Sequence, residues 1–244
     1  MGRSSPTALG PAFVLHRRAY GNHGLLLEFF TPEAGRLAAV ARGVKGRRGG
    51  GGAALLQPFT PLLIAWSGRG EVKTLVRYEA AAAPLPLAGR ALYCGFYLNE
   101  LLLRLTRRGD PGTTLFSHYA GTLERLADPE ALEPALRRFE LQLLECLGYG
   151  LILDREAETD SPLVPERRYH YRPEQGPVPA RPGDADAISG ATLLALHRDR
   201  PLGPRQLAEA RRLSRQVLAH YLGDRPLKSR ELFDHPHAAG DDDR

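Results

Sequence analysis

The sequence predicts an α+β protein of more than one domain, in which a small five-stranded β-barrel precedes an α-helical domain. Three observations lead to this prediction. Short apolar runs bounded by turn residues fill the first third of the chain, apolar residues recur at helical spacing after Pro84, and basic residues are concentrated before residue 80. We expect a barrel domain at residues 1–80, a helical domain at 81–235 and a disordered tail at 236–244.

The first 80 residues contain five extended runs, at residues 12–20, 25–30, 35–43, 58–66 and 71–78. Turns rich in glycine or proline separate them, among them Gly21-Asn22-His23-Gly24 and Ser67-Gly68-Arg69-Gly70. No predicted helix longer than one turn lies between them. Five short strands in such a segment are typical of a closed or partly closed barrel, for which the OB-fold is the natural candidate.

Five later segments show the apolar spacing of amphipathic helices: residues 86–107, 113–127, 129–148, 188–198 and 204–222. Asp128-Pro129 predicts the start of the third helix, with Asp128 as its N-cap and Pro129 at its first position. Residues 150–185 contain six prolines and no periodicity, which predicts a loop-rich excursion within the helical domain.

The excess of positive over negative charge is confined to the predicted barrel. Residues 1–80 hold eleven Lys and Arg against four Glu, a net charge of +7, whereas the whole chain has a net charge of +5. This distribution favours a polyanion-binding surface on the barrel. A small basic domain without such a partner is the alternative.

The segment ARGVKGRRGGGG, from Ala41 to Gly52, places four cations among glycines: Arg42, Lys45, Arg47 and Arg48. Arg17 and Arg18 on the first predicted strand add to them. Cations beside aromatic rings suit single-stranded nucleic acid, because the cations contact phosphates and the rings stack on bases. A plain connecting loop, and rings that belong to the core, are the alternatives. The candidate rings are Tyr20, Phe30, Trp66 and Tyr78.

The sequence contains no convincing catalytic motif. Residues 68–74 lack the Gly-Lys pair of a phosphate-binding loop and lead into a strand, and the histidines and serines form no metalloprotease or nucleophile-elbow motif. We therefore expect no enzyme, with catalytic residues assembled only by the fold as the alternative. Cys94 and Cys146 lack metal-site spacing and predict buried free thiols. The sequence has no long apolar run and no signal peptide, which predicts a cytoplasmic, nucleoid-associated protein.

Several stretches occur in an order that matches a known family. They are AFVLHRRAYGNHGLLLEFFTPEAGRLAAVARGVKG, LLQPFTPLL, GRGEVKTL, LYCGFYLNELLLRL, PALRRFELQLLECLGYG and YLGDRPLKSRELF. Together they span about residues 12–233 and resemble the RecO family of bacterial DNA repair proteins. The resemblance implies an OB-fold, a helical domain and no enzymatic activity. It also implies binding of single- and double-stranded DNA, annealing of complementary strands, and cooperation with RecR in loading RecA onto strands coated with single-stranded DNA-binding protein.

The resemblance also implies roles for particular residues. The basic loop would contact phosphates through Arg42, Lys45, Arg47 and Arg48, with Arg17, Arg18 and Lys73 as secondary contacts. The third helix would bind the acidic, phenylalanine-ended tail of the single-stranded DNA-binding protein in an apolar slot beside two cations, formed by Leu136, Arg137, Arg138, Phe139 and Leu143. An ordinary amphipathic helix is the alternative for this segment.

Some members of the family carry a four-cysteine zinc site in the excursion after the third helix. Residues 150–185 contain no cysteine here, so we expect no structural zinc and no cofactor. The main alternative to a recombination mediator is a general OB-fold module that binds single-stranded nucleic acid without docking a partner. An enzyme acting on nucleic acid is a third possibility.

Overall fold

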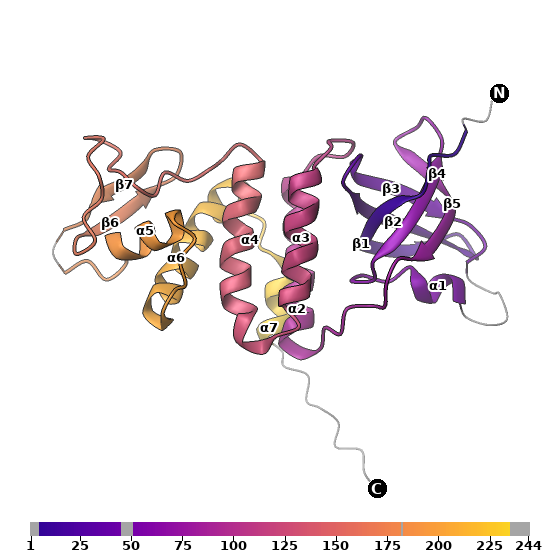
Figure 1. The fold of residues 1–244 in the computed structure, drawn as a ribbon. Coiled ribbons are helices and arrows are strands. Elements are labelled where there is room, and N and C mark those ends of the chain that lie inside the picture. Colours follow the sequence, from indigo (N-terminus) through magenta and orange to yellow (C-terminus); the bar gives the residue numbers. More distant parts are fainter. Residues whose placement is uncertain (1–4, 45–50, 182, 235–244) are drawn as a thin grey trace, which may run out of the picture. The chain divides into compact units, whose positions relative to one another are not determined.

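A computed structural model describes residues 5–44, 51–181 and 183–234 (Figure 1). The chain forms two compact units. The first comprises residues 1–127 together with the C-terminal segment from Pro226, and the second comprises Asp128–Arg225. The tail predicted at 236–244 lies outside the described residues.

Five strands close into a barrel in the order β1-β2-β3-β5-β4. They are β1 (Gly10–Tyr20), β2 (Gly24–Thr31), β3 (Gly35–Ala41), β4 (Leu62–Ser67) and β5 (Val72–Ala80), with the short helix α1 (Gly51–Leu55) between β3 and β4. Neighbouring strands are antiparallel except β3 and β5, which run parallel. The predicted five-stranded, OB-like barrel is confirmed.

The fourth strand starts later than the sequence predicts. Phe59 has a φ of 64°, which interrupts the extended chain and delays β4 until Leu62. The Phe59 ring is buried and packs edge-on against Phe96, with the two ring centroids 5.2 Å apart.

The barrel is filled by alternate residues of its strands. Leu25, Leu27 and Phe29 of β2 belong to this interior, together with side chains such as Leu37 and Ile64. Strand β1 changes register between Val14 and His16, where a β-bulge makes Leu15 an extra residue.

A second apolar layer joins the outside of the barrel to two helices, α2 (Gly89–Leu105) and α3 (Thr113–Arg125). Phe13 meets Tyr119 edge-on at a centroid distance of 5.4 Å, and Phe30 lies 5.7 Å from Phe116. Phe30 is therefore a core residue with 1% of its surface exposed, as the alternative reading expected, and its candidate role as a base-stacking ring is wrong.

A buried chain of hydrogen bonds crosses this layer. Asn99 of α2 donates from Nδ2 to the carbonyl oxygen of Leu15 at 2.9 Å, and the Tyr119 hydroxyl of α3 donates to Asn99 Oδ1 at 2.6 Å. Burial raises the pKa of Tyr119, so the hydroxyl keeps the proton it donates.

The C-terminal segment returns to α2. The backbone N–H groups of Lys228 and Ser229 donate to the Glu100 carboxylate at 2.9 and 2.8 Å, at the start of the turn η2 (Lys228–Arg230) and ahead of α7 (Glu231–Asp234). The first unit therefore contains both the N-terminal barrel and the last described residues of the chain.

The second unit combines helices with a three-stranded sheet of order β7-β6-β8. Asp128 accepts a hydrogen bond from the N–H of Glu130, as its predicted N-cap role requires, although it caps the turn η1 (Pro129–Ala131) that precedes the helix. The other elements are α4 (Leu132–Cys146), β6 (Arg168–Arg172), β7 (Gly176–Pro179), β8 (Ile188–Ser189), α5 (Gly190–His197) and α6 (Pro204–Leu222). Strands β6 and β7 lie in the excursion at 150–185, which we predicted to be rich in loops and for which we predicted no strand.

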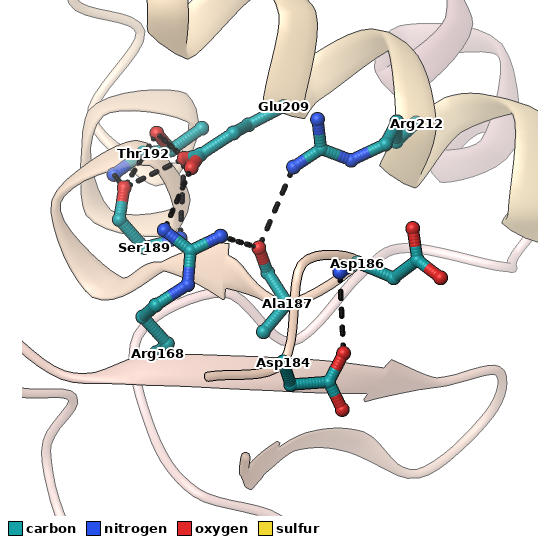
Figure 2. Close-up of polar contacts among 8 residues, drawn as sticks. All are labelled: Arg168, Asp184, Asp186, Ala187, Ser189, Thr192, Glu209 and Arg212. Carbon is teal, nitrogen blue, oxygen red and sulfur yellow. Dashed lines mark hydrogen bonds and ion pairs between the residues drawn. The ribbon is translucent and has the colours of Figure 1, made fainter. Parts of the chain in front are cut away.

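A buried carboxylate ties this unit together (Figure 2). Glu209 of α6 accepts hydrogen bonds from the hydroxyl groups of Thr192 at 2.5 Å and Ser189 at 2.7 Å, and from the Ser189 N–H at 3.1 Å. Arg168 of β6 lies 3.4 Å from the same carboxylate and also donates to the carbonyl of Ala187. Burial alone raises the pKa of Glu209, but the bonds from Thr192 and Ser189 outweigh it, so the pKa lies below its usual value.

One expectation about the cysteines is wrong. Cys94 is buried in α2 as expected, but Cys146, the last residue of α4, is exposed. Burial raises the pKa of the Cys146 thiol nonetheless, and Glu145 adds to this effect.

We predict that Asn99→Leu destabilises the first unit by about 2 to 3 kcal/mol, because the Leu15 carbonyl and the Tyr119 hydroxyl lose a buried partner. Urea unfolding of the variant measures this change. Ser117→Ala on the exposed face of α3 is the control and should change stability by less than about 0.5 kcal/mol. Equal stability of Asn99→Leu and wild type would show that the buried hydrogen bonds of Asn99 make no net contribution to the free energy of unfolding.

We predict that the second unit loses stability as the pH falls. The folded-state pKa of Glu209 is depressed, so its contribution is complete above the ordinary glutamate pKa of about 4.3 and is lost as the pH falls through the lower folded value. Glu209→Gln should unfold more easily at pH 7 and show a weaker loss between pH 5 and 3. Hydrogen exchange of α5 and α6 amides measures both effects, with exposed Glu166→Gln as the control.

Candidate nucleic-acid interface

The register of the barrel decides where the basic residues of β1 point. Arg18 lies opposite Leu26, which lies opposite Val40, and this row faces outward because its neighbours Leu25 and Leu27 fill the interior. Arg17 lies opposite Leu27 and has the inward parity.

Arg17 nevertheless remains exposed, because it lies at one end of the barrel where α1 packs. Its guanidinium donates to the carbonyl oxygen of Ala53 at 3.4 Å. The two adjacent arginines of β1 therefore serve different surfaces, and only Arg18 belongs to the outer face of the sheet.

Arg42 lies at the same end of the barrel as the β1–β2 turn, since it directly follows Ala41, which pairs with Leu25. Tyr20 is the last residue of β1, directly before that turn, and has 52% of its surface exposed. We call Arg18, Tyr20 and Arg42 the first basic face. Its two cations and one accessible ring are the groups that single-stranded nucleic acid requires.

The predicted basic loop starts and ends beside this barrel end. Lys45, Arg47 and Arg48 lie outside the described residues. On either side of them, Val44 and Ala53 pack against the barrel core. Both attachment points of the loop are thus fixed to the unit that carries the first basic face.

The remaining candidate rings are less accessible than Tyr20. Trp66 and Tyr78 are partly buried and pack against the barrel core. Tyr20 is consequently the best placed of the four predicted rings for stacking on a base.

Lys73 lies apart from the other predicted DNA contacts. It lines a cavity of about 510 Å³ with Arg36, Arg107 and Arg108, at the starts of β3 and β5 and beside the α2–α3 connection. Arg42 follows the opposite end of β3. The structure therefore places Lys73 with three arginines that the sequence analysis did not select. The parallel pairing of β3 with β5 brings Lys73 to β3, and the bridges of Arg108 to Gly35 and Arg36 bring the α2–α3 connection there.

The five residues predicted on the third helix do not form one surface slot. Phe139 and Leu143 have 0% of their surface exposed, and Arg137 is buried in an ion pair with Glu140 at 2.8 Å. Leu136 is half-buried, and it lies on a different side of α4 from Arg138 because residues two apart do not share a helix face.

Arg138 is the cation of this set that reaches the surface. Its side chain is 43% exposed and pairs with Asp199, whose side chain is 57% exposed. The half-buried apolar residue one turn along the same face is Leu141.

Two features of the described residues bear on other functional classes. No three His, Cys, Asp or Glu side chains within residues 5–44, 51–181 and 183–234 are grouped as metal ligands would be. None of the described helices is long and apolar enough to cross a membrane.

Comparison with known proteins gives consistent matches along the chain. The family model "Recombination protein O N terminal" matches residues 7–84, and "Recombination protein O C terminal" matches residues 87–231. The boundary between the two matches follows the last strand of the barrel.

Similar proteins from three bacteria are each named DNA repair protein RecO. The protein of Methylococcus capsulatus is 54% identical over 235 residues, which cover 95% of either chain. That of Nitrosococcus oceani is 49% identical over 93% of this chain and 92% of its own, and that of Halorhodospira halophila is 48% identical over 91% and 95%. The chain therefore belongs to the RecO family of DNA repair and recombination proteins.

Proposed function

We propose that this protein is a non-enzymatic recombination mediator. It binds single- and double-stranded DNA, anneals complementary strands and, with RecR, helps RecA load onto strands coated with single-stranded DNA-binding protein. The observation that carries the proposal is the first basic face on an OB-like barrel, in a chain that belongs to the RecO family.

The cations of the barrel supply what annealing needs. Two strands repel each other through their phosphates, and cations that neutralise phosphates lower this repulsion without reading sequence. Arg18 and Arg42 project from the barrel, and the loop adds Lys45, Arg47 and Arg48 directly after Arg42. Tyr20 offers a ring that any base can stack on.

We further propose that α4 docks the acidic tail of the coating protein through Arg138. An exposed ion pair contributes little to stability, so a carboxylate of the tail can replace Asp199 as the partner of Arg138. Leu141, on the same face, is the nearest candidate for apolar contact with the tail. Phe139 and Leu143 support this face from within the core.

We predict that replacing Arg42, Lys45, Arg47 and Arg48 by alanine flattens the salt dependence of DNA binding. Each lost phosphate contact lowers the log–log slope by about 0.7 for a single strand, so four contacts lower it by roughly 3. Fluorescence anisotropy across a salt series measures the slope. A control that removes four exposed arginines of the second unit, Arg200, Arg205, Arg215 and Arg225, should leave it unchanged. Equal slopes for the loop variant and wild type would reduce the loop to a connector.

We predict that annealing of strands coated with the cognate single-stranded DNA-binding protein depends on that protein's acidic tail. Arg138→Ala should slow this annealing about 2- to 5-fold, the effect of one exposed charge pair, and Asp199→Ala should speed it. Arg215→Ala is the matched control. The measurement is a fluorescence annealing assay with tailed and tailless coating protein.

The same assay separates the proposal from its main alternative. Annealing of bare strands only, with no effect of the tail, identifies a general OB-fold module that docks no partner. Tail-dependent annealing that Arg138→Ala leaves untouched moves the docking site away from α4.

A further inference from the structure

The barrel carries a second concentration of positive charge that the proposed function does not use. Arg36, Lys73, Arg107 and Arg108 line the cavity of about 510 Å³ described above, and we call this set the second basic pocket. We propose that the second basic pocket binds the phosphate backbone of a second nucleic-acid strand while the first basic face holds the other. This inference rests on the proposed function.

The pocket contains more positive charge than its acidic residues neutralise. Glu28 is shared by Arg36, at 3.7 Å, and Arg108. Glu71 is the one acidic residue among those that line the cavity, so even with Glu28 included four cations face two carboxylates. Burial lowers the pKa of Arg36, Glu28 partly offsets this, and the nearby Arg108 lowers it further. An anion entering the cavity would relieve this crowding of like charges.

The pocket also has unused donors. Within the part of the chain that the structure describes, neither Lys73 nor Arg107 has a hydrogen-bond or ion-pair partner, and Lys73 is already half-buried. The buried Nε of Arg36 donates no hydrogen bond, since Glu28 is too distant. Ammonium and guanidinium donors around one cavity match the several acceptor oxygens of a phosphate.

The lining favours a phosphate backbone over an acidic peptide. Its two apolar residues, Leu37 and Ala38, have 5% and 1% of their surfaces exposed and offer no slot for a side chain. Thr106 directs its hydroxyl to the carbonyl oxygen of Leu102 at 2.7 Å. The accessible part of the lining is therefore charged, as repeated phosphates require.

The first basic face and the second basic pocket are separate sites on one barrel. Arg36 and Arg42 lie near opposite ends of β3, about 20 Å apart at roughly 3.3 Å per residue. The outer face between them is apolar or acidic: Leu26 pairs with Val40, and Glu28 and Val72 flank Ala38. One strand would find no continuous line of cations across this surface, whereas two strands can each occupy one site.

The test compares Lys73→Ala/Arg107→Ala with a control of equal charge in the same unit, Arg90→Ala/Arg125→Ala. The pocket variant, Lys73→Ala/Arg107→Ala, leaves Arg36, Arg108 and Glu28 intact, so the contacts between the helices and the barrel are kept. Three quantities are measured at fixed salt with DNA in excess over protein. They are the affinity for one labelled single strand, the capture of a second, non-complementary labelled strand by energy transfer, and the rate of annealing.

We expect the pocket variant to bind the first strand within about twofold of wild type, while second-strand capture and annealing fall about tenfold. Capture and annealing equal to the control overturn the inference and leave the proposed function standing. A loss of first-strand affinity that accounts for the whole loss of annealing also overturns it, because the pocket then extends the first site. A wild-type protein that binds no DNA removes the proposed function, and the inference with it.

Discussion

The hydrogen bond from Asn99 to the carbonyl of Leu15 is the contact on which the first unit depends. Leu15 is the extra residue of a β-bulge, so its carbonyl has left the barrel ladder at a buried position. A buried carbonyl needs a partner, and Asn99 supplies it while Tyr119 satisfies the other end of the Asn99 amide. One bulge thus fixes α2 and α3 against the barrel, and Phe13 and Phe30 fill the space between them.

The same bulge decides which charge faces DNA. Before it, Val14 pairs with Phe29 and points into the barrel, and after it His16 pairs with Glu28. Without the extra residue, Arg18 would fall opposite Leu25 and take the inward parity, and Arg17 would fall opposite the outward Leu26. Because a slip of one residue exchanges the two faces of a strand, the bulge places Arg18 on the outer face and leaves Arg17 beside α1.

The sequence patterns predict the helices and strands better than they predict the contacts and pairings between them. The five barrel strands and the amphipathic helices follow from alternation and helical spacing, and both are local properties of the chain. The bulge has no such signal, so strand alternation separates Arg17 from Arg18 but could not show which of the two faces outward. Lys73 joins Arg36 and Arg107 through two long-range contacts that have no local signal: the parallel pairing of β3 with β5, and the bridges of Arg108 to Gly35 and Arg36.

Other misses have similar causes. Proline content argued against strands in the excursion, yet Pro177 and Pro179 are in β7, an edge strand of its sheet, where a missing N–H is tolerated. On α4, helical spacing identified Phe139 and Leu143 as one face but could not show that this face is buried. Arg137 accompanies that buried face only because Glu140, one turn along, neutralises it.

The excursion itself is held by a carboxylate that sequence spacing could not pair with Ser189 and Thr192. Glu209 joins α6, the start of α5 and β6 by accepting hydrogen bonds from Ser189, Thr192 and Arg168. The Glu209 carboxylate, an acceptor that several elements share, thereby holds the end of an excursion that has little regular structure.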